Sequence, residues 1–211
     1  TVVPSGTYLV SGLTINQPQE ILFMSGSVIK LADSSNVPVI SVAAAGVSLL
    51  GHGVIDGNRA NQTGSSDHTI SCVGFDRLLV DGLTIRESNQ KGIYIADSND
   101  SAVLRCQISN TDGMGIQGRA QSGSLNNFVV DSCIVDRSDS ASNNDGCIEV
   151  TKDVGGIEII APSISNNIVK MHRSPTGSNV VPIELFGGIR YGRVEGNYVE
   201  GGLIGISVAN T

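Results

Sequence analysis

The chain has 211 residues, a net charge of −7 and an aromatic content of 4%. The length allows a sizeable core, but the acidic balance argues against a nucleic-acid-binding protein, because a phosphate-binding surface needs clustered Lys and Arg. An anionic polymer would also be repelled unless local Arg or a cation compensates. The 26 glycines and the scarcity of helix-period apolar stripes favour short strands separated by turns.

The first quarter of the chain contains neither a predicted leader nor a predicted membrane span. Thr1–Val10 lacks a basic start followed by an apolar run, so no signal peptide is expected there. Val37–Ile55 is apolar, but Pro38, His52 and several glycines interrupt it. This stretch therefore predicts two core strands and a tight turn rather than a membrane insertion.

Three sets of apolar residues recur in the same order along the chain. The first set is Ile40, Ile70, Ile93, Ile116, Ile148, Ile183 and Ile206. The second set is Leu50, Val80, Val103, Val130, Ile164 and Val194, and the third is Ile55, Ile85, Ile108, Val135, Val169 and Val199. Members of the first set are 30, 23, 23, 32, 35 and 23 residues apart, so a minimum step of 23 carries insertions. This pattern predicts a repeat architecture whose insertions lie in loops.

One repeat shows what each unit contains. In Leu78–Ile95 apolar and polar residues alternate, which is the periodicity of strands. The spacing leaves room for three short strands and three turns, and stacking the repeats would pair each strand with its counterpart about 4.8 Å away. The sequence therefore predicts an all-β, single-domain parallel β-helix over residues 1–211, with three parallel sheets and about seven coils.

The corner between the second and third strands carries cysteines and asparagines. The equivalent corner residues are Leu83, Cys106, Cys133, Asn167 and Asn197. Cys106 and Cys133 are expected to stack as buried apolar side chains, with a disulfide between them as the alternative. The Asn residues suggest left-handed or turn backbone geometry at this corner. No Cys-x-x-Cys spacing is present, so a structural zinc site is not expected.

The pattern resembles the right-handed parallel β-helix proteins related to pectate lyases, polygalacturonases and bacteriophage tailspikes. The opening Val2–Val10 looks like a first strand of such domains, and Gly53–Asn58, "GVIDGN", looks like a segment of their early turns. The family usually has a capping helix before the first strand. The resemblance therefore implies an uncapped fragment of a longer protein.

In the family the Asn-bearing corner separates the second and third sheets, and the substrate groove runs along the first sheet. By that analogy the first set of isoleucines marks the groove sheet, and the insertions within 136–147, 151–163 and 170–182 would build its walls. Tyr94, Gln117, Glu149 and Glu184 would then form an outward row across four turns. Glu149 and Glu184 would be neighbours about 5 Å apart, a spacing used for glycoside hydrolysis, although both could equally be solvated surface residues.

Two further segments match polygalacturonase motifs in part. "NTDGMGI" from Asn110 matches the Asn-Thr-Asp-Gly motif, and "NDGCIEV" supplies Asp145 within the Asp-Asp-Cys-Ile motif. Asp112 and Asp145 are therefore expected on adjacent turns at the groove. Gly146 replaces the second Asp, and the family's Gly-His motif is missing from the next turn, so a pectin-cleaving polygalacturonase is not expected. Asn-x-Asp-Gly is also ordinary turn chemistry without a catalytic duty.

The resemblance and the carboxylates together predict an endo-acting glycoside hydrolase. Asp145, Glu149 and Glu184 are the expected acid, base or nucleophile, with their individual roles open, and Asp112 would position water. Tyr94, Gln117 and Arg119 would bind sugar hydroxyls. No metal site is predicted, although Asp112, Asp145 and Glu149 could supply oxygens to Ca²⁺.

The resemblance also implies a setting, and it leaves other classes open. A phage tailspike or secreted depolymerase would act on an extracellular or cell-surface polysaccharide, and tailspikes of this kind are homotrimers. A polysaccharide lyase would need a Tyr or Lys base beside a neutralised uronate. An alginate epimerase would carry Asp-Pro-His where this chain has Ile95–Ser98, "IADS". A non-catalytic structural or carbohydrate-binding β-helix is the remaining alternative.

Overall fold

The computed structural model describes residues 1–64, 67–137, 146–153, 155–171, 181–202 and 204–209. The regular structure in these residues consists of β-strands and one short 3-10 turn, η1 (Arg59–Asn61). The strands form three eight-stranded parallel sheets and a small three-stranded one. None of the described residues belongs to a helix that is long and apolar enough to cross a membrane.

Each large sheet takes one strand from every turn of the chain. Sheet A contains β1 (Val2–Val3), β4 (Glu20–Phe23), β7 (Ser48–Gly51), β10 (Leu79–Asp81), β13 (Ala102–Leu104), β17 (Val129–Asp131), β21 (Ser163–Ser165) and β25 (Arg193–Glu195). Sheet B contains β2 (Gly6–Val10), β5 (Ser27–Leu31), β8 (Val54–Asp56), β11 (Thr84–Ser88), β14 (Gln107–Thr111), β18 (Ile134–Arg137), β22 (Ile168–Met171) and β26 (Tyr198–Glu200). Sheet C contains β3 (Leu13–Ile15), β6 (Ile40–Val42), β9 (Ile70–Val73), β12 (Ile93–Ala96), β15 (Ile116–Ala120), β19 (Ile148–Lys152), β23 (Ile183–Phe186) and β27 (Ile206–Ala209). The small sheet D contains β16 (Leu125–Asn126), β20 (Ile159–Ile160) and β24 (Ile189–Arg190).

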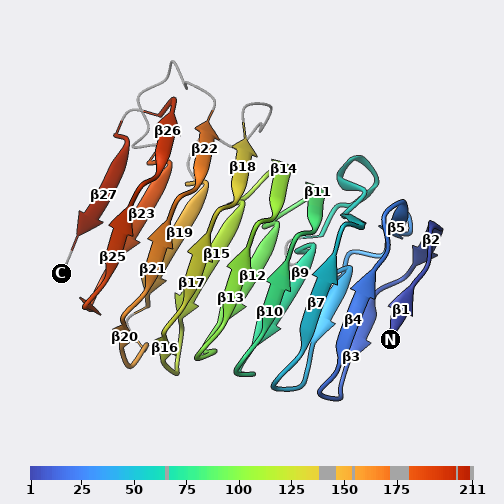
Figure 1. The fold of residues 1–211 in the computed structure, drawn as a ribbon, viewed down its shortest axis with the longest axis horizontal. Helices are drawn as coiled ribbons and strands as arrows, with labels where there is room; N and C mark the ends of the chain where they lie inside the picture. The colour runs from blue at the N-terminus through green and yellow to red at the C-terminus, as the bar shows by residue number, and fades with distance from the viewer. Residues whose placement is uncertain (65–66, 138–145, 154, 172–180, 203, 210–211) are drawn as a thin grey trace.

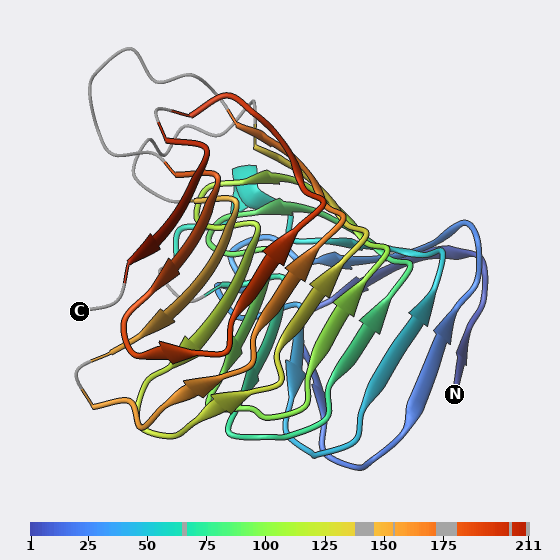
Figure 2. The same cartoon turned by 60° about the vertical axis from the view of Figure 1, so that its left-hand side comes forward.

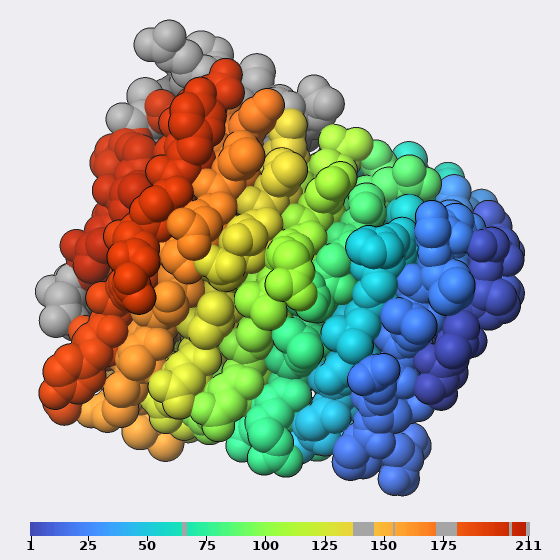
Figure 3. Space-filling model, viewed as in Figure 1, coloured from blue at the N-terminus to red at the C-terminus, as the bar shows by residue number. Residues whose placement is uncertain are grey.

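The chain winds through sheets A, B and C in that order, once per coil, so the molecule is a parallel β-helix (Figures 1 and 2). The coils lie side by side as parallel bands from the N-terminal to the C-terminal end (Figure 3). The predicted fold class is confirmed. The coils number eight rather than about seven, because β1, β2 and β3 already complete one.

Strand register confirms the first and third sets of apolar residues as stacked core ladders. In sheet C, Ile148 pairs with Ile116 on one side and with Ile183 on the other. In sheet B, Ile85 pairs with Ile55 and with Ile108. These six isoleucines are almost fully buried, and burial of such ladders supplies the main stabilisation of the cylinder.

The second ladder is correct from Val80 onward, but Leu50 does not belong to it. Leu49 pairs with Val80 and is fully buried, whereas Leu50 pairs with Asp81 on the outer side of sheet A. The reason is one extra residue at this corner. Leu49 and Ile55 are six positions apart, whereas Val80 and Ile85 are five apart.

The corner between sheets A and B also differs in detail from the prediction. The left-handed residues are Arg105, Ser132, Asn166 and Gly196, each one position before the predicted corner residue. Asn167 and Asn197 instead act through their side chains, because Asn197 Oδ1 accepts the backbone N–H of Asn167 at 2.9 Å. Asn167 Oδ1 in turn accepts the N–H of Cys133 at 2.9 Å, so a ladder of side-chain hydrogen bonds links successive coils.

The four cysteines are buried and free. Cys106 and Cys133 lie at successive positions of the corner ladder, as predicted, and the alternative disulfide between them is not formed. Their side chains therefore fill the core at the corner position that Asn167 and Asn197 occupy in later coils.

Candidate functional site

One row of outward side chains runs along sheet C from coil to coil. Side chains alternate in and out along each strand, so the residue after each core isoleucine faces outward. The row, in register from coil to coil, is Thr14, Ser41, Ser71, Tyr94, Gln117, Glu149, Glu184 and Ser207. The predicted alignment of Tyr94, Gln117, Glu149 and Glu184 on four consecutive strands is confirmed.

Glu149 and Glu184 are direct neighbours within this row. They are register partners on β19 and β23, about 4.8 Å apart at the backbone. Gln117, on the strand before Glu149, donates from Nε2 to Glu149 Oε1 at 2.6 Å. An amide N–H that donates to a carboxylate favours its ionised form. Glu149 is therefore the member of the pair that accepts the Gln117 amide.

Gln117 is 2% exposed, so its amide serves this contact within the protein. Its Oε1 atom is buried and has no hydrogen-bond partner among the described residues. Leaving a buried carbonyl oxygen without a partner is unfavourable. The hydrogen bond to Glu149 therefore orients the Gln117 amide, although this orientation leaves the amide oxygen without a partner in the described part of the chain.

A second feature of the same face is a concave region of about 460 Å³ around Tyr94, which we name the Tyr94 pocket. Its lining is Pro38, His68, Ser71, Lys91, Tyr94, Arg119 and Gln121. The Tyr94 ring lies 4.8 Å from the His68 ring and 4.9 Å from Lys91 Nζ. Arg119 forms an ion pair with Asp153, with Nη2 and Oδ2 2.8 Å apart. The pocket is therefore aromatic, and it contains the basic side chain of Lys91 and the ion-paired guanidinium of Arg119.

Burial sets the protonation states in the Tyr94 pocket. Desolvation raises the pKa of the Tyr94 hydroxyl, although Arg119 opposes this by its charge and by a hydrogen bond. Burial, followed by the positive charge of Lys91, lowers the pKa of His68 to about 4. At neutral pH Tyr94 is thus protonated and His68 uncharged. Since His68 Nδ1 accepts the backbone N–H of Lys91 at 3.4 Å, its proton belongs on Nε2.

Pro38, His68, Lys91 and Gln121 of the Tyr94 pocket were not predicted from the sequence. His68 and Lys91 each stand two positions before a core isoleucine, namely Ile70 and Ile93. Strict alternation does not extend into the turn before a strand, so strand periodicity gave no reason to place them on this face. The sequence feature that could have identified them is their equal spacing from the core isoleucines, because both lie two positions before one.

Asp112 lies off this row, in the turn between β14 and β15. Arg59 Nη1 is 2.9 Å from Asp112 Oδ1, and Arg59 Nε is 3.6 Å from Glu87 Oε2. Asn110 has a left-handed backbone and donates from Nδ2 to Glu87 Oε1 at 2.6 Å. The Asn-x-Asp-Gly segment therefore forms a corner network with the η1 insertion, which fits the turn interpretation.

Asp145 lies outside the described residues, as do 138–145 and 172–180 within the loops predicted to wall the groove. The chain that the structure describes contains no group of three or more His, Cys, Asp or Glu side chains placed to hold a metal ion. The Ca²⁺ alternative through Asp112, Asp145 and Glu149 stays a prediction, because one of its three residues is not described.

The chain was compared with family models, curated sequences and solved structures. No family model matches the chain, and no curated protein sequence matches it. Among solved structures, the chain is similar to the A-module of Azotobacter vinelandii mannuronan C-5 epimerase AlgE4. The identity is 15%, the TM-score is 0.44, and the match covers 100% of this chain and 86% of that one.

Proposed function

We propose that this β-helix is a polysaccharide depolymerase that hydrolyses glycosidic bonds within a chain at Glu149 and Glu184. The observation that carries the proposal is the in-register placement of the two glutamates on adjacent strands, with Gln117 donating to one of them. A strand spacing of about 4.8 Å brings two like carboxyl groups close. Carboxyl groups on neighbouring strands can reach the separation of roughly 5 to 5.5 Å used by retaining glycosidases.

The hydrogen bond from Gln117 suggests individual roles. Glu184, in its acid form, would donate a proton to the glycosidic oxygen while the Glu149 carboxylate attacks the anomeric carbon. The bond to the leaving sugar breaks, and an ester forms between the sugar and Glu149. Water, deprotonated by Glu184, would then attack the anomeric carbon, release Glu149 and restore the proton on Glu184. Asp145 stays a third candidate carboxylate, and Asp112 a candidate for positioning water.

The Tyr94 pocket supports a sugar-binding role beside the glutamates. Tyr94 and Glu149 are two strands apart, roughly 10 Å at the backbone. A polymer that lies along the row would contact both places at once. Tyr94 and Arg119 offer a ring face, a hydroxyl and N–H groups, which is the mixture that sugar recognition needs. In this proposal Gln117 acts on Glu149 rather than on the sugar.

A polysaccharide lyase of acidic polymers is the second candidate, favoured by the cationic side chains at Tyr94. Arg119 and Lys91 could neutralise a uronate carboxylate, and elimination would then need a base that removes the adjacent carbon-bound proton. Tyr94 is protonated at neutral pH, and the His68 lone pair at Nδ1 already accepts a backbone N–H. Neither group is ready to accept a proton, so this candidate ranks below hydrolysis. An epimerase needs the same base and ranks with it.

The test is release of reducing ends from a panel of capsular, O-antigen and plant polysaccharides. Glu149→Gln and Glu184→Gln should each lower kcat by about 10²- to 10⁴-fold, the usual contribution of one acid–base group. The matched control is Glu200→Gln on β26, an exposed glutamate of sheet B, which should retain full activity. Thermal unfolding midpoints of all three variants verify that each one folds.

The products separate the candidate functions. Unsaturated uronates detected by ultraviolet absorption would replace hydrolysis by the lyase. Epimerised residues in an uncut polymer, seen by proton NMR, would replace it by the epimerase. If every polymer binds and none is cut or altered, the chain is a non-catalytic carbohydrate-binding β-helix.

The resemblance to tailspikes and secreted depolymerases supports the wider setting of this proposal. We place the protein outside the cell or on a virion, acting on a cell-surface polysaccharide, and as a homotrimer. Light scattering after size exclusion tests the trimer. Activity after removal of Ca²⁺ by a chelator, compared with activity after Ca²⁺ is added back, tests whether the site needs that ion.

A further inference from the structure

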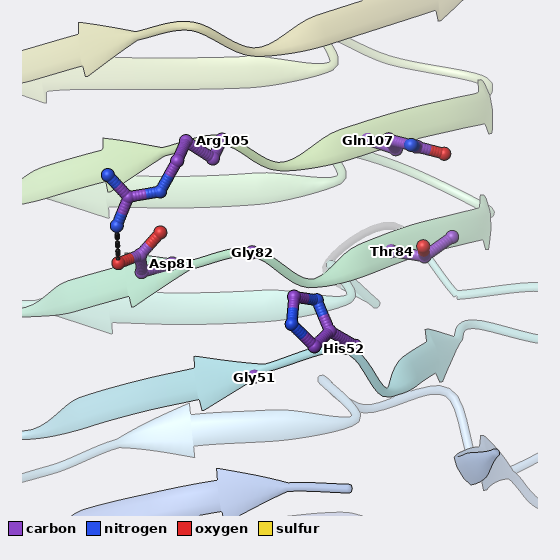
Figure 4. Close-up of a pocket in the computed structure, with 7 residues that line it drawn as sticks. All are labelled: Gly51, His52, Asp81, Gly82, Thr84, Arg105 and Gln107. Atoms are coloured by element: carbon purple, nitrogen blue, oxygen red, sulfur yellow. Dashed lines mark hydrogen bonds and ion pairs between the residues drawn. The ribbon is translucent and has the colours of Figure 1, made fainter. Parts of the chain in front are cut away.

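A second concave region lies away from sheet C, at the corner between sheets A and B. This corner hollow has a volume of about 490 Å³ and spans three consecutive coils (Figure 4). Its lining is Gly51, His52, Asp81, Gly82, Thr84, Arg105 and Gln107. The volume falls within the usual range for small-ligand sites. The proposed hydrolysis uses none of these residues.

The hollow exists because two successive corners have no side chain. Gly51 and Gly82 have φ values of +117° and +77°, and in the next coil Arg105 takes the corresponding position. A Cβ on Gly82 would lie 2.6 Å from the carbonyl oxygen of Gly51, and one on Gly51 would lie 2.2 Å from that of Phe23. Only glycine fits at these two corners. The floor of the hollow is therefore bare backbone, and the Arg105 side chain rises at one end.

The extra residue of the third coil supplies the other wall. His52 is the residue that lengthens the corner between Leu49 and Ile55, as a bulge does when it redirects a side chain. Its ring lies beside the second glycine, because a Cβ on Gly82 would be 3.9 Å from His52 Cε1. Figure 4 shows the ring between the strand of Gly51 and that of Gly82. The insertion that shifted the register of Leu50 thus places a flat imidazole over the hollow.

The polar groups around the hollow have balanced charge. Arg105 forms an ion pair with Asp81 across the two coils (Figure 4). Thr84 and Gln107 are register partners on β11 and β14 and add a hydroxyl and an amide to the rim. Donors and acceptors are therefore mixed, with no excess of either charge.

We propose that the corner hollow binds a neutral hexose unit of a polysaccharide, as a second site that takes no part in cleavage. Sugar hydroxyls both donate and accept, so they fit the carboxylate, guanidinium, hydroxyl and amide groups at the rim. The flat His52 ring offers a surface for the apolar face of a pyranose. Because Asp81 already pairs with Arg105, the described lining of the hollow has no unpaired positive charge to attract the carboxylate of an acidic sugar. Binding at this hollow needs neither Glu149 nor Glu184.

The experiment is an NMR titration of the Glu149→Gln variant, which keeps a sugar probe intact. The probes are hexasaccharides from dextran, mannan and galactan, with a polygalacturonate hexasaccharide as the acidic comparator. At least one neutral probe should shift the His52 ring and Arg105 Nε signals. His52→Ala and Arg105→Ala should each weaken that binding about tenfold, which corresponds to the loss of one well-formed polar contact.

Arg193→Ala is the matched control variant. Arg193 is 66% exposed and paired with Glu195, much as Arg105 is 64% exposed and paired with Asp81. It should bind the probe as the unaltered chain does. The proposal is overturned if no neutral probe shifts these signals at about 10 mM, far above a useful affinity. It is also overturned if only the acidic probe shifts them, or if His52→Ala and Arg105→Ala bind normally. Because the readout is binding, a failure to cleave any polymer leaves this result interpretable.

Discussion

The sheet C face has two halves that share one backbone and differ in charge. The cationic half consists of Tyr94 with Lys91 and Arg119, and the acidic half consists of Glu149 and Glu184. Tyr94, Glu149 and Glu184 stand beside the same ladder of isoleucines, and Gln117, on the strand that also carries Arg119, lies between Tyr94 and Glu149. The comparison teaches that the backbone of this fold fixes the distance between outward side chains, while the type of side chain changes from one strand to the next.

The two halves also treat their titratable groups differently. In the cationic half, burial removes the charge of His68 and keeps the Tyr94 hydroxyl protonated at neutral pH. In the acidic half, a single amide contacts one of two neighbouring carboxyl groups. The first arrangement suits binding, and the second distinguishes two neighbouring carboxyl groups by the partner of one of them.

The largest loss of stability is expected when a buried isoleucine of the shared ladder is replaced by alanine below either half. Ile93→Ala and Ile148→Ala each remove a fully buried side chain, so each should lower the free energy of unfolding by about 2 to 5 kcal/mol. Denaturant unfolding measures this loss. The functional losses should differ. Loosening Ile148 displaces Glu149 and lowers kcat, whereas loosening Ile93 displaces Tyr94 and raises KM.

Ile206→Ala is the control for that experiment. Ile206 belongs to the same ladder but is 44% exposed, so its loss should cost less than about 1 kcal/mol. If Ile148→Ala and Ile93→Ala alter kcat and KM alike, the division of the face into a binding half and a reacting half is wrong.

A smaller effect is expected from pH, and it belongs to the cationic half. His68 has a pKa of about 4 in the folded chain against a usual 6.5, so between these values the unfolded chain binds more protons. The free energy of unfolding therefore rises with pH across this window. Between pH 7 and pH 5, His68 should remove about 2 kcal/mol of stability, reduced somewhat because the pocket is open to solvent.

His68→Asn should abolish this part of the pH dependence, since it keeps a polar side chain without a titrating group. The charged groups facing His68 are Lys91, directly, and Arg119 across Tyr94. Denaturant unfolding at pH 7 and pH 5 gives the comparison. His52→Asn, at the exposed corner, should keep the dependence of the unaltered chain. An unchanged dependence in His68→Asn would assign it to carboxyl groups elsewhere.

Much of the fold was predictable because the insertions fall in loops and leave the ladder spacing intact. The pairing of Glu149 with Glu184 followed from that spacing alone. Leu50 was misassigned because the bulge at His52 adds one residue, and a spacing of five fitted the other coils. The role of Asn167 was also missed, because its side chain acts on the neighbouring coil rather than on its own turn.

The candidate site was less predictable than the fold for the same physical reason. Alternation places residues within strands, so it found Tyr94 and Glu149. It says nothing of turns, so it missed His68 and Lys91. The motif that placed Asp112 at the groove did not predict its ion pair with Arg59. Long-range contacts of turn residues depend on insertions such as η1, whose course a repeat period does not define.

The boundary between the halves gives the smallest and most specific prediction. Gln117→Leu removes the N–H that donates to Glu149, and a hydrogen bond to a charged group is worth about 1.5 to 3 kcal/mol. The acidic limb of the kcat/KM profile should therefore move to higher pH. Tyr94→Phe, which alters only the cationic half, should raise KM and leave that limb in place. A limb that stays fixed in Gln117→Leu would mean that the ionisation of Glu149 does not depend on this amide, and the roles given to the two glutamates would have to be exchanged or abandoned.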